Sequence, residues 1–537
     1  MPRILVADKI AEPGLERLRA ASDVTFDVRH GLPPAELARA VAEYDGLLIR
    51  SAVTVTADVL AHPGKLRAIA RAGVGVDNVD LDAATAAGVL VLNTPDANTI
   101  STAEHTFAVM LALHRRIAAA HAHLIGGGWN RAAYEGEQLA GMTLGVVGYG
   151  RIGRAVARRA LAFEMEVIVF DPFVTPSTSR NESVTFVDSL HALLQRADCV
   201  TLHATLSPDT DHMIGPAELS AMKPSATIVN CARGALIDES ALADALNADR
   251  IGGAALDVYE HEPPTDSPLL SARNVVLTPH LAASTAEAQT RVSVDAVDAL
   301  VAYLLRGEIR SAVNVTGLPA QLSPRARSFI DLAGRMGTIL SPWCAAGVDR
   351  ISLTVNGDSL AEVAATLALQ AMTSVLGPHV DTRLNLVNAK GFAADRGIVV
   401  EHTVQPIASG RPDSIVVTAH ARGETHSIEG TVLADRQPRV LAIDGYRMEV
   451  VPERTLVLIF NDDQPGVIGL VGRRVGDAGI NIADMALSRR DRRALMLLKL
   501  DAPLPDAVRD ALRASNPPIL SVRTISLPPA SSGSAEA

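Results

Sequence analysis

Residues 144–153 read Leu-Gly-Val-Val-Gly-Tyr-Gly-Arg-Ile-Gly, which predicts an apolar strand, a glycine-rich turn and the start of a helix. In such a unit Gly148 allows a tight turn, Gly150 lets the backbone approach a pyrophosphate, and Gly153 lets the helix pack on the strand. The unpaired amides and the macrodipole of the helix N-terminus favour negative charge. The pattern predicts a dinucleotide-binding turn, with a tight turn of another α/β unit as the alternative.

The next predicted strand, residues 166–170, supports the first interpretation. It is followed by Asp171, 18 positions after Gly153. A carboxylate at about this offset hydrogen-bonds the adenosine ribose, and it repels the 2′-phosphate of NADP. The sequence therefore predicts NAD as the cofactor.

Composition limits the function classes. A chain of 537 residues is expected to form several domains, and a net charge of −11 without long like-charge runs argues against nucleic acid as the main partner. Cys199, Cys231 and Cys344 are too few and too scattered for a disulfide framework or a thiolate metal cluster. No uncharged apolar run is expected to approach the roughly 18 residues that span a bilayer, and the chain opens on a predicted strand, not a signal peptide. We therefore expect a cytoplasmic protein without metal or membrane contact.

The N-terminal region alternates between strand-like and helical runs, which predicts a parallel sheet covered by helices. Strands are expected at 4–7, 47–49, 67–70 and 90–92, and helices at 15–21, 34–43 and 102–116. Polar or glycine-rich segments follow three strands, at 50–51, 73–78 and 93–98. Ligands bind outside the carboxyl ends of such strands, although each segment alone is also compatible with an ordinary turn.

Three later strand ends carry chemically useful side chains: Arg233 after 227–230, Glu262 after 253–257, and His280 after 275–278. The arginine fork suits a carboxylate. Histidine titrates near neutrality and can exchange a proton with a secondary alcohol, and a neighbouring glutamate would favour its charged form. Each side chain alone also fits a structural role, as a turn cap, a solvated charge or a core histidine.

Together these segments resemble the D-isomer-specific 2-hydroxyacid dehydrogenases, continuously from Ile4 to about Asn314. The resemblance rests on the glycine turn with Asp171 and on the stretches Asn230-Cys231-Ala232-Arg233-Gly234, Glu262-Pro263-Pro264 and 278–285, Thr-Pro-His-Leu-Ala-Ala-Ser-Thr. It implies that His280 is the acid/base, Glu262 its partner and Arg233 the carboxylate anchor. Two positions depart from the family: His203 is followed by Ala204 where a proline is common, and Glu164 stands at a usual glycine.

The resemblance also implies the ligand contacts. Those expected for NAD are Gly148, Gly150, Arg151, Ile152, Gly153, Asp171, Cys231, Ala232, Arg233, Asp257, His280, Ala282 and Ala283. Those expected for the substrate are Arg50, Ser51, Gly73, Val74, Gly75 and Asn98, with Arg50 and Arg131 toward a phosphate.

The implied fold is a Rossmann-type, doubly wound NAD domain (98–284) inserted in a flavodoxin-like substrate domain (1–97 and 285–316). The helix expected from Ala286 to Leu305 would return to complete the substrate domain.

The last folded region has the order β-α-β-β-α-β, which predicts a ferredoxin-like sheet over 453–528. Asp463-Gln464-Pro465-Gly466 and Gly479-Ile480-Asn481-Ile482 resemble the amino-acid-sensing ACT domain. The resemblance implies that Asp463 and Asn481 bind an effector across a dimer interface, with a purely structural dimerisation sheet as the alternative. Residues 529–537 are predicted to be disordered.

Residues 317–452, and 385–389 (Asn-Leu-Val-Asn-Ala) most specifically, resemble the intervening α+β domain, like an allosteric-substrate-binding domain, of the family members that act on 3-phospho-D-glycerate. The implied activity is NAD-dependent oxidation of 3-phospho-D-glycerate to 3-phosphohydroxypyruvate, the first step of L-serine biosynthesis, in a homodimer or homotetramer under feedback by L-serine. Two alternatives stay open: an enzyme for another 2-hydroxyacid such as 2-hydroxyglutarate, and a NAD-sensing corepressor or scaffold.

Overall fold

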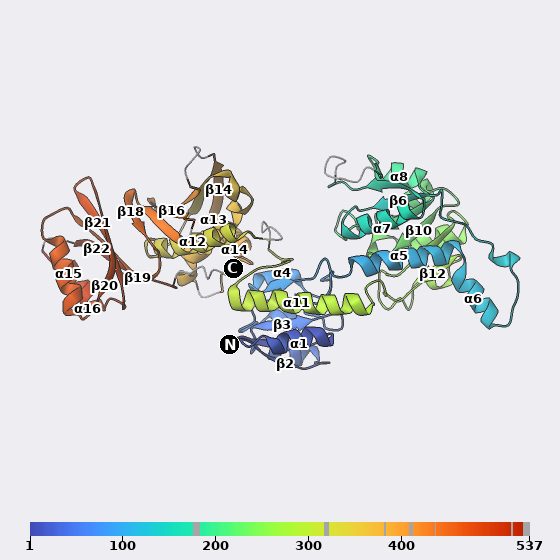
Figure 1. Cartoon of the computed structure of the whole chain (residues 1–537), viewed down its shortest axis with the longest axis horizontal. Coiled ribbons are helices and arrows are strands. Elements are labelled where there is room, and N and C mark those ends of the chain that lie inside the picture. The colour runs from blue at the N-terminus through green and yellow to red at the C-terminus, as the bar shows by residue number, and fades with distance from the viewer. Residues whose placement is uncertain are drawn as a thin grey trace.

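Four β-sheets follow one another along the described chain (Figure 1). The computed structural model describes residues 1–174, 183–315, 322–380, 383–406, 412–434, 436–516 and 519–529. The first sheet and the long helix packed on it lie between the second sheet on one side and the third and fourth on the other.

The first sheet is fully parallel with the order β2-β1-β3-β4-β5, which is the flavodoxin-like order. Its strands are β1 (Arg3–Val6), β2 (Thr25–Val28), β3 (Gly46–Ile49), β4 (Ala68–Arg71) and β5 (Leu90–Leu92). Its helices are α1 (Glu12–Ala20), α2 (Pro34–Val41), α3 (Ala57–Leu60), α4 (Leu81–Ala86) and α11 (Ala286–Arg306). The central strands are buried on both faces, as expected for a sheet with helices on both sides.

Helix α11 comes from far along the chain and completes the first sheet. It packs on α1, β3 and β4, and the hydroxyl of Ser293 accepts a hydrogen bond from the amide of Ala11 at 3.1 Å. A side chain at Gly14 would collide with Ser293. The chain therefore leaves the first sheet at α5 and returns to it at α11, as expected.

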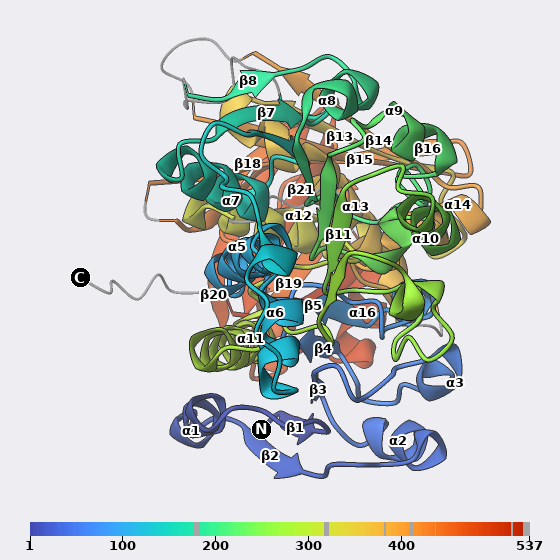
Figure 2. The same ribbon diagram turned by 90° about the vertical axis from the view of Figure 1, so that its right-hand side faces the viewer.

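The second sheet has the order β12-β11-β10-β9-β6-β7-β8, all parallel, in which the strand order reverses beside β6 as in a Rossmann sheet. Its strands are β6 (Thr143–Val147), β7 (Glu166–Phe170), β8 (Thr185–Phe186), β9 (Cys199–Leu202), β10 (Thr227–Asn230), β11 (Gly253–Leu256) and β12 (Val275–Leu277). The helical segments after β6 are α7 (Arg151–Ala162), α8 (Leu190–Arg196), α9 (Pro216–Ala221), η3 (Gly234–Leu236), α10 (Glu239–Asn247) and η4 (Pro268–Ser271). Figure 2 shows α5 and α7 on one side of this sheet and α9 and α10 on the other.

Strand β2 and helix α6 (Ile117–Ile125) are among the elements of this half that were not predicted. Strand β2 is an edge strand with little burial. Helix α6 is apolar on most sides and buries none of its residues, so it lacks the alternation of apolar and polar faces that predicts a packed helix. Helix α6 follows α5 (Thr99–His114) and precedes the short turn η1 (Ala132–Tyr134).

The third sheet is mixed, with β13 and β14 parallel and the other pairs antiparallel, in the order β14-β13-β15-β16-β17-β18. Its strands are β13 (Arg350–Asn356), β14 (Val399–Gln405), β15 (Ser414–Ala421), β16 (Glu424–Val432), β17 (Pro438–Ile443) and β18 (Tyr446–Val450). Its helical segments are α12 (Pro324–Leu340), η5 (Ser341–Trp343), η6 (Asp358–Val363), α13 (Ala364–Leu376), η7 (Gly377–His379) and α14 (Ala389–Asp395).

One expectation about this region is corrected. Within the described residues, the helical stretch Asp358–His379 is long and apolar enough to cross a membrane by length and composition alone. It is mostly buried, however, because α13 packs beside α12 on the third sheet. The stretch is therefore apolar for the reason that core helices are.

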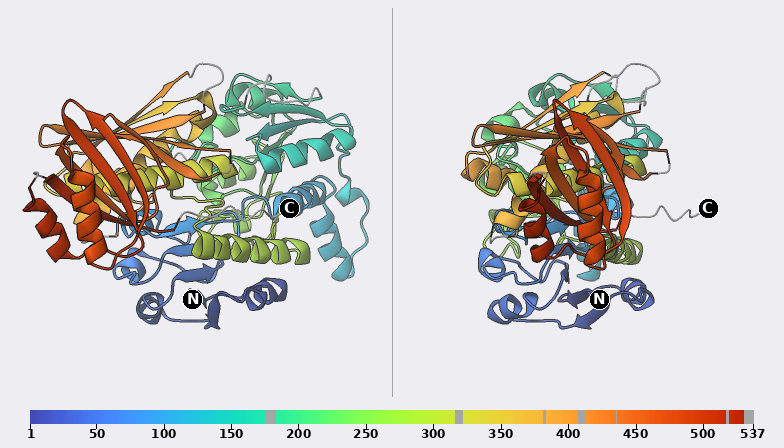
Figure 3. Two further views of the ribbon diagram at one scale, coloured as in Figure 1. Left: turned by 60° about the vertical axis from the view of Figure 1, so that its left-hand side comes forward. Right: turned by 90° about the vertical axis from the view of Figure 1, so that its left-hand side faces the viewer.

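The fourth sheet is antiparallel with the order β20-β21-β19-β22, and its βαββαβ succession is the predicted ferredoxin-like arrangement (Figure 3). Its elements are β19 (Arg454–Asp462), α15 (Val467–Asp477), β20 (Ile482–Arg490), β21 (Arg493–Leu500), α16 (Asp506–Arg513) and β22 (Ile519–Leu527). Its inner residues join the apolar core of the third sheet, through Leu456, Leu458 and Leu497 among others. The predicted disorder of the tail falls on residues from 530 onward, outside the described chain, apart from Pro529.

Candidate active site

The glycine turn between β6 and α7 has the geometry that the sequence predicts. Gly148 has φ +91°, and a Cβ there would lie 2.7 Å from the backbone of His203 and Ala204. A Cβ on Gly153 would collide with the carbonyl of Gly148, whereas one on Gly150 would meet nothing within 4 Å. The turn is therefore closed where helix and strand pack together and open at the N-terminus of α7, where a pyrophosphate fits.

The carboxylate of Asp171 faces this turn from the end of β7. It accepts hydrogen bonds from the amide of Tyr149 at 2.7 Å and from that of Phe173 at 2.8 Å. A ribose beside the turn would meet an acceptor here, so the residues present fit NAD.

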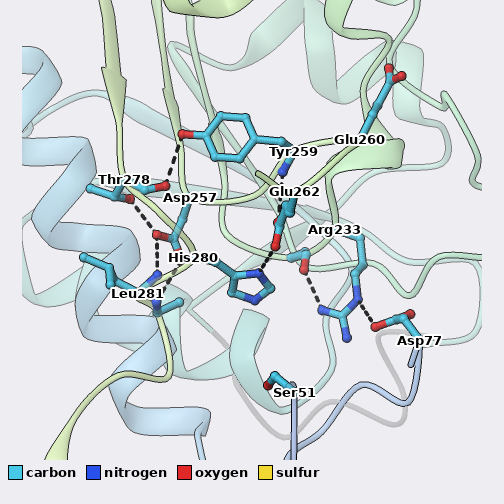
Figure 4. A network of polar contacts seen from close by, with 12 residues as sticks. Ser51, Asp77, Arg233, Asp257, Tyr259, Glu260, Glu262, Thr278, His280 and Leu281 are labelled. Carbon is cyan, nitrogen blue, oxygen red and sulfur yellow. Dashed lines mark hydrogen bonds and ion pairs between the residues drawn. The ribbon is translucent and has the colours of Figure 1, made fainter. Parts of the chain in front are cut away.

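The pair formed by His280 and Glu262 is the chemical centre of the site (Figure 4). Nδ1 of His280 lies 2.7 Å from Oε2 of Glu262, and Oε1 of Glu262 accepts the amide of Tyr259 at 3.2 Å. The bond from Glu262 raises the pKa of His280 above its ordinary value, although burial opposes it. Burial raises the pKa of Glu262, but the bond and charge of His280 outweigh this and lower it. The side chains are 49% and 37% exposed, so the pair can exchange a proton with a ligand.

Arg233 faces the same space from the end of β10. Its Nε lies 3.1 Å from Asp77 of the first domain, and its Nη1 donates to the carbonyl of Ala232 at 2.7 Å. Its Nη2 lies so close to Gly75 that any side chain there would collide with it. The guanidinium therefore lies against a loop of the first domain with one edge turned to the cavity (Figure 4).

A cavity of about 380 Å³ joins these residues to the loops of the first sheet. All six expected substrate residues line it together with Arg233, Glu262 and His280: Arg50, Ser51, Gly73, Val74, Gly75 and Asn98. The carboxamide oxygen of Asn98 is buried without a hydrogen-bond partner in the described chain, so it is available to a ligand. Arg131 is exposed and is not among the lining residues, so the described chain does not bring it to the cavity.

Arg71 is a lining residue that the sequence analysis missed. It ends β4, donates from Nη2 to the hydroxyl of Ser51 at 3.1 Å, and its buried Nε has no partner among the described residues. Burial first, and then the charges of Arg233 and Arg50, lower its pKa. An arginine that ends an otherwise apolar strand just before a glycine-rich loop was the available signal.

The other expected cofactor contacts lie at the same edge of the second sheet. Arg151 and Ile152 open α7, Cys231 and Ala232 follow β10, and Ala282 and Ala283 follow His280. Arg151 forms an ion pair with Asp96 of the first domain. Burial raises the pKa of Cys231 to about 12, so its thiol stays protonated. These contacts stay predictions.

Asp257 is fully buried, and both carboxylate oxygens are occupied by the chain itself. Oδ1 accepts the amide of Leu281 at 2.7 Å and the hydroxyl of Thr278 at 2.6 Å, and Oδ2 accepts the amide of Ala282 at 2.8 Å. Nε2 of His105 lies 3.1 Å from Oδ1. The side chain thus faces the loop that carries His280, and its expected contact with NAD stays a prediction.

The two expected effector residues lie at opposite ends of the fourth sheet. Asp463 follows β19 and pairs with Arg489, whereas Asn481 precedes β20 and donates to Asp501 at 2.9 Å. The strand registers put Asp462 beside Arg493 and Ile482 beside Leu500, a full strand length apart. One copy of the chain therefore does not bring them together. The described residues contain no group of three or more potential metal ligands.

Comparisons with known proteins agree with this geometry. Residues 107–282 match the D-isomer specific 2-hydroxyacid dehydrogenase, NAD binding domain, and residues 325–444 match the D-3-phosphoglycerate dehydrogenase intervening domain. Fold and site thus define a NAD-dependent dehydrogenase of the 2-hydroxyacid class.

Relatives that align with nearly the whole chain show which family within this class it belongs to. The chain is 40% identical to the D-3-phosphoglycerate dehydrogenase of Methanocaldococcus jannaschii, over 96% of this chain and 98% of the relative. It is 38% identical to that of Bacillus subtilis, over 98% and 100%. The crystal structure of the TT0316 protein from Thermus thermophilus matches 58% of this chain and 99% of its own, with a TM-score of 0.53 and 38% identity. The chain belongs to the D-3-phosphoglycerate dehydrogenase family.

Proposed function

We propose that this chain oxidises 3-phospho-D-glycerate to 3-phosphohydroxypyruvate with NAD, the first step of L-serine biosynthesis. The observation that carries the proposal is the cavity in which three arginines, Arg50, Arg71 and Arg233, surround the pair of His280 and Glu262. The substrate carries a carboxylate and a phosphate, about three negative charges in all. Arginine is suited to both groups because its fork binds either one through two hydrogen bonds.

In the proposed mechanism Arg233 holds the substrate carboxylate with its free edge, beside the backbone of Gly73 to Gly75. The C2 hydroxyl points to Nε2 of His280, because Nδ1 is occupied by Glu262. His280 is neutral in the oxidation direction and takes the hydroxyl proton, and the imidazolium that forms is stabilised by the carboxylate of Glu262. NAD supplies the acceptor for the hydride that leaves C2. In the reverse direction protonated His280 returns the proton to the keto oxygen.

Arg50 and Arg71 would hold the phosphate at the other end of the cavity. Arg71 has a buried Nε without a partner in the described chain, and burial lowers the pKa of its guanidinium. A phosphate there would satisfy the buried donor and compensate the positive charge.

The experiment follows NADH absorbance with purified protein, 3-phospho-D-glycerate and NAD while the product is withdrawn, together with reduction of phosphohydroxypyruvate. We expect turnover in both directions. Arg71→Leu is expected to raise KM for the phosphorylated substrate about tenfold to a hundredfold, since a hydrogen bond to a charged group contributes about 1.5–3 kcal/mol. No turnover of either phosphorylated compound would refute the proposal.

The second candidate is a dehydrogenase or reductase for another 2-hydroxyacid such as 2-hydroxyglutarate. Solved relatives include a glyoxylate reductase with 30% identity and a TM-score of 0.54, so the same catalytic fold accompanies other 2-hydroxyacids. Reduction of 2-oxoglutarate with a higher kcat/KM than phosphohydroxypyruvate would favour this candidate.

We also propose the domain limits 1–97 with 285–316, 98–284, 317–452 and 453–528, and a homo-oligomeric, cytoplasmic enzyme with a C-terminal ACT domain that binds L-serine. The ferredoxin-like order supports the domain assignment. The separation of Asp463 from Asn481 in one copy supports a site made from two copies. L-Serine should therefore lower turnover in the wild type and not in Asn481→Ala. If saturating serine does not change wild-type turnover, the fourth domain has a role in assembly alone.

A further inference from the structure

The second domain, which is built on the second sheet, contains another histidine–carboxylate pair, and its histidine has no role assigned above. His105, on α5, places Nε2 3.1 Å from Oδ1 of Asp257 and 3.2 Å from the hydroxyl of Thr278. The histidine side chain is 18% exposed and the aspartate is fully buried. The two residues lie 152 positions apart in the chain.

The hydrogen-bond pattern fixes where the protons lie. Burial raises the pKa of Asp257, but the bonds from His105, from Thr278 and from the amides of Leu281 and Ala282 outweigh it and lower the pKa below its ordinary value. Asp257 is therefore ionised and can only accept. The hydroxyl of Thr278 already donates to Asp257 at 2.6 Å, so the proton between His105 and Asp257 must lie on Nε2 of His105.

Asp257 connects His105 to the loop that carries His280. Its two oxygens hold the amides of Leu281 and Ala282, and its own carbonyl accepts the amide of His280 at 2.9 Å. His280 has φ +54°, a left-handed conformation that is uncommon for residues other than glycine and that hydrogen bonds of the loop help to hold. The bonds to Asp257 and to the carbonyl of Thr278 are those hydrogen bonds.

His105 connects that loop to the substrate side of the cleft. Helix α5 starts directly after Asn98, which lines the cavity, and then runs into the core of the second domain beside α7 and β11. The N-cap of this helix thus lines the substrate cavity, and His105 contacts the support of His280 about two turns later.

We infer that His105 is a positioning residue for the proposed reaction: it ties α5 to the loop of His280 through Asp257, and so fixes the imidazole relative to the bound substrate. The inference rests on the proposed function. It concerns the orientation of the base, and His105 itself touches neither substrate nor hydride.

The test compares His105→Leu, which removes the donor, with His105→Gln, whose amide nitrogen can occupy the place of Nε2. Oxidation of 3-phospho-D-glycerate and of its C2-deuterated form gives kcat, KM and the isotope effect on kcat. We expect His105→Leu to lower kcat about tenfold to a hundredfold, the size of effect that a small misplacement of a reacting group produces, with KM changed less than about threefold. The isotope effect should rise because the hydride step becomes slower relative to product release. His105→Gln should restore most of the loss.

The same helix offers a matched control. His114 is also buried and also bonds to a threonine and a carboxylate, Thr227 at 3.0 Å and Glu137 at 3.2 Å, but it lies at the far end of α5. His114→Leu should lower the unfolding temperature at least as much as His105→Leu while kcat and the isotope effect stay at the wild-type values.

The following results for the variants would overturn the inference. A wild-type kcat and isotope effect in His105→Leu would show that the bond does not orient the base. An equal loss in His105→Gln and His105→Leu, or in His114→Leu, would show a general effect on folding. Failure of the wild type to oxidise 3-phospho-D-glycerate would instead refute the proposed function, so the two failures are distinguishable.

Discussion

Two histidine–carboxylate pairs of the second domain, His280 with Glu262 and His105 with Asp257, consist of the same chemical groups in opposite surroundings. In one, Glu262 accepts one backbone amide besides His280, and both side chains are at least one third exposed beside a cavity. In the other, Asp257 accepts three further donors besides His105 and has no exposed surface. A carboxylate with few other donors can stabilise its histidine when the imidazole gains or loses a proton. A carboxylate whose oxygens are all occupied by donors instead holds the backbone in place. Solvent access and the number of donors, not residue type, separate the pair proposed as acid/base from the pair proposed as its support.

The largest effect is expected from removal of the acid/base itself. His280→Ala should lower kcat by ~10²–10⁴-fold in both directions, because general acid–base catalysis contributes about that much. Binding of NADH, followed by its fluorescence, should change little. If kcat stays within tenfold of the wild-type value, a group other than His280 exchanges the proton.

Glu262→Gln tests the exposed pair through its pH profile. Oxidation needs neutral His280 and reduction needs the imidazolium, and Glu262 raises the pKa of His280. Loss of the carboxylate should lower that pKa, so the acidic limb of the oxidation profile and the alkaline limb of the reduction profile both move to lower pH. At pH 7 reduction should fall more than oxidation, by about tenfold to a hundredfold. If both limbs stay at their wild-type pH, Glu262 does not set the pKa of His280.

Asp257→Asn tests the buried pair through stability. The lowered pKa means that the carboxylate stabilises the folded chain above its unfolded pKa, about 3.9, and that this contribution is lost as the pH falls through the folded value. The amide leaves several donors unpaired, so at pH 7 we expect a loss of about 3–5 kcal/mol, measured by calorimetry, together with reduced turnover. Glu262→Gln should lose much less stability, since its pair is partly solvated. If Asp257→Asn and Glu262→Gln lose the same free energy of unfolding, the two pairs do not differ in their contribution to stability.

Thr278→Val is the mildest change to the same network. It keeps the shape of the side chain and removes one of the four donors to Asp257, at a cost of about 1–2 kcal/mol. The carbonyl of Thr278 still accepts the hydroxyl of Tyr259, so the loop stays in place and kcat should fall less than about threefold. A loss as large as that of Asp257→Asn would mean that the hydroxyl, not the carboxylate, holds the loop.

Much of the catalytic site could be predicted from local patterns. Glycines at 148, 150 and 153 fix one turn, and Asp171 follows the next strand. Arg233, Glu262 and His280 each follow a strand of one parallel sheet. The carboxyl ends of parallel strands lie at one edge, so residues that follow those strands meet there whatever the details of packing. The resemblance to known dehydrogenases added the substrate residues.

Sequence patterns and the resemblance therefore predicted the sheets of the two catalytic domains, the cofactor turn and the pairing of His280 with Glu262. Three relations became visible only in the folded chain: Arg71 lines the cavity, His105 meets Asp257 across 152 positions, and Asp463 and Asn481 stand at opposite ends of their sheet. These relations depend on which helix face packs on which sheet and on strand register. Residue spacing gives the period of a helix or strand, but contacts between distant segments are set by the packing of the whole chain.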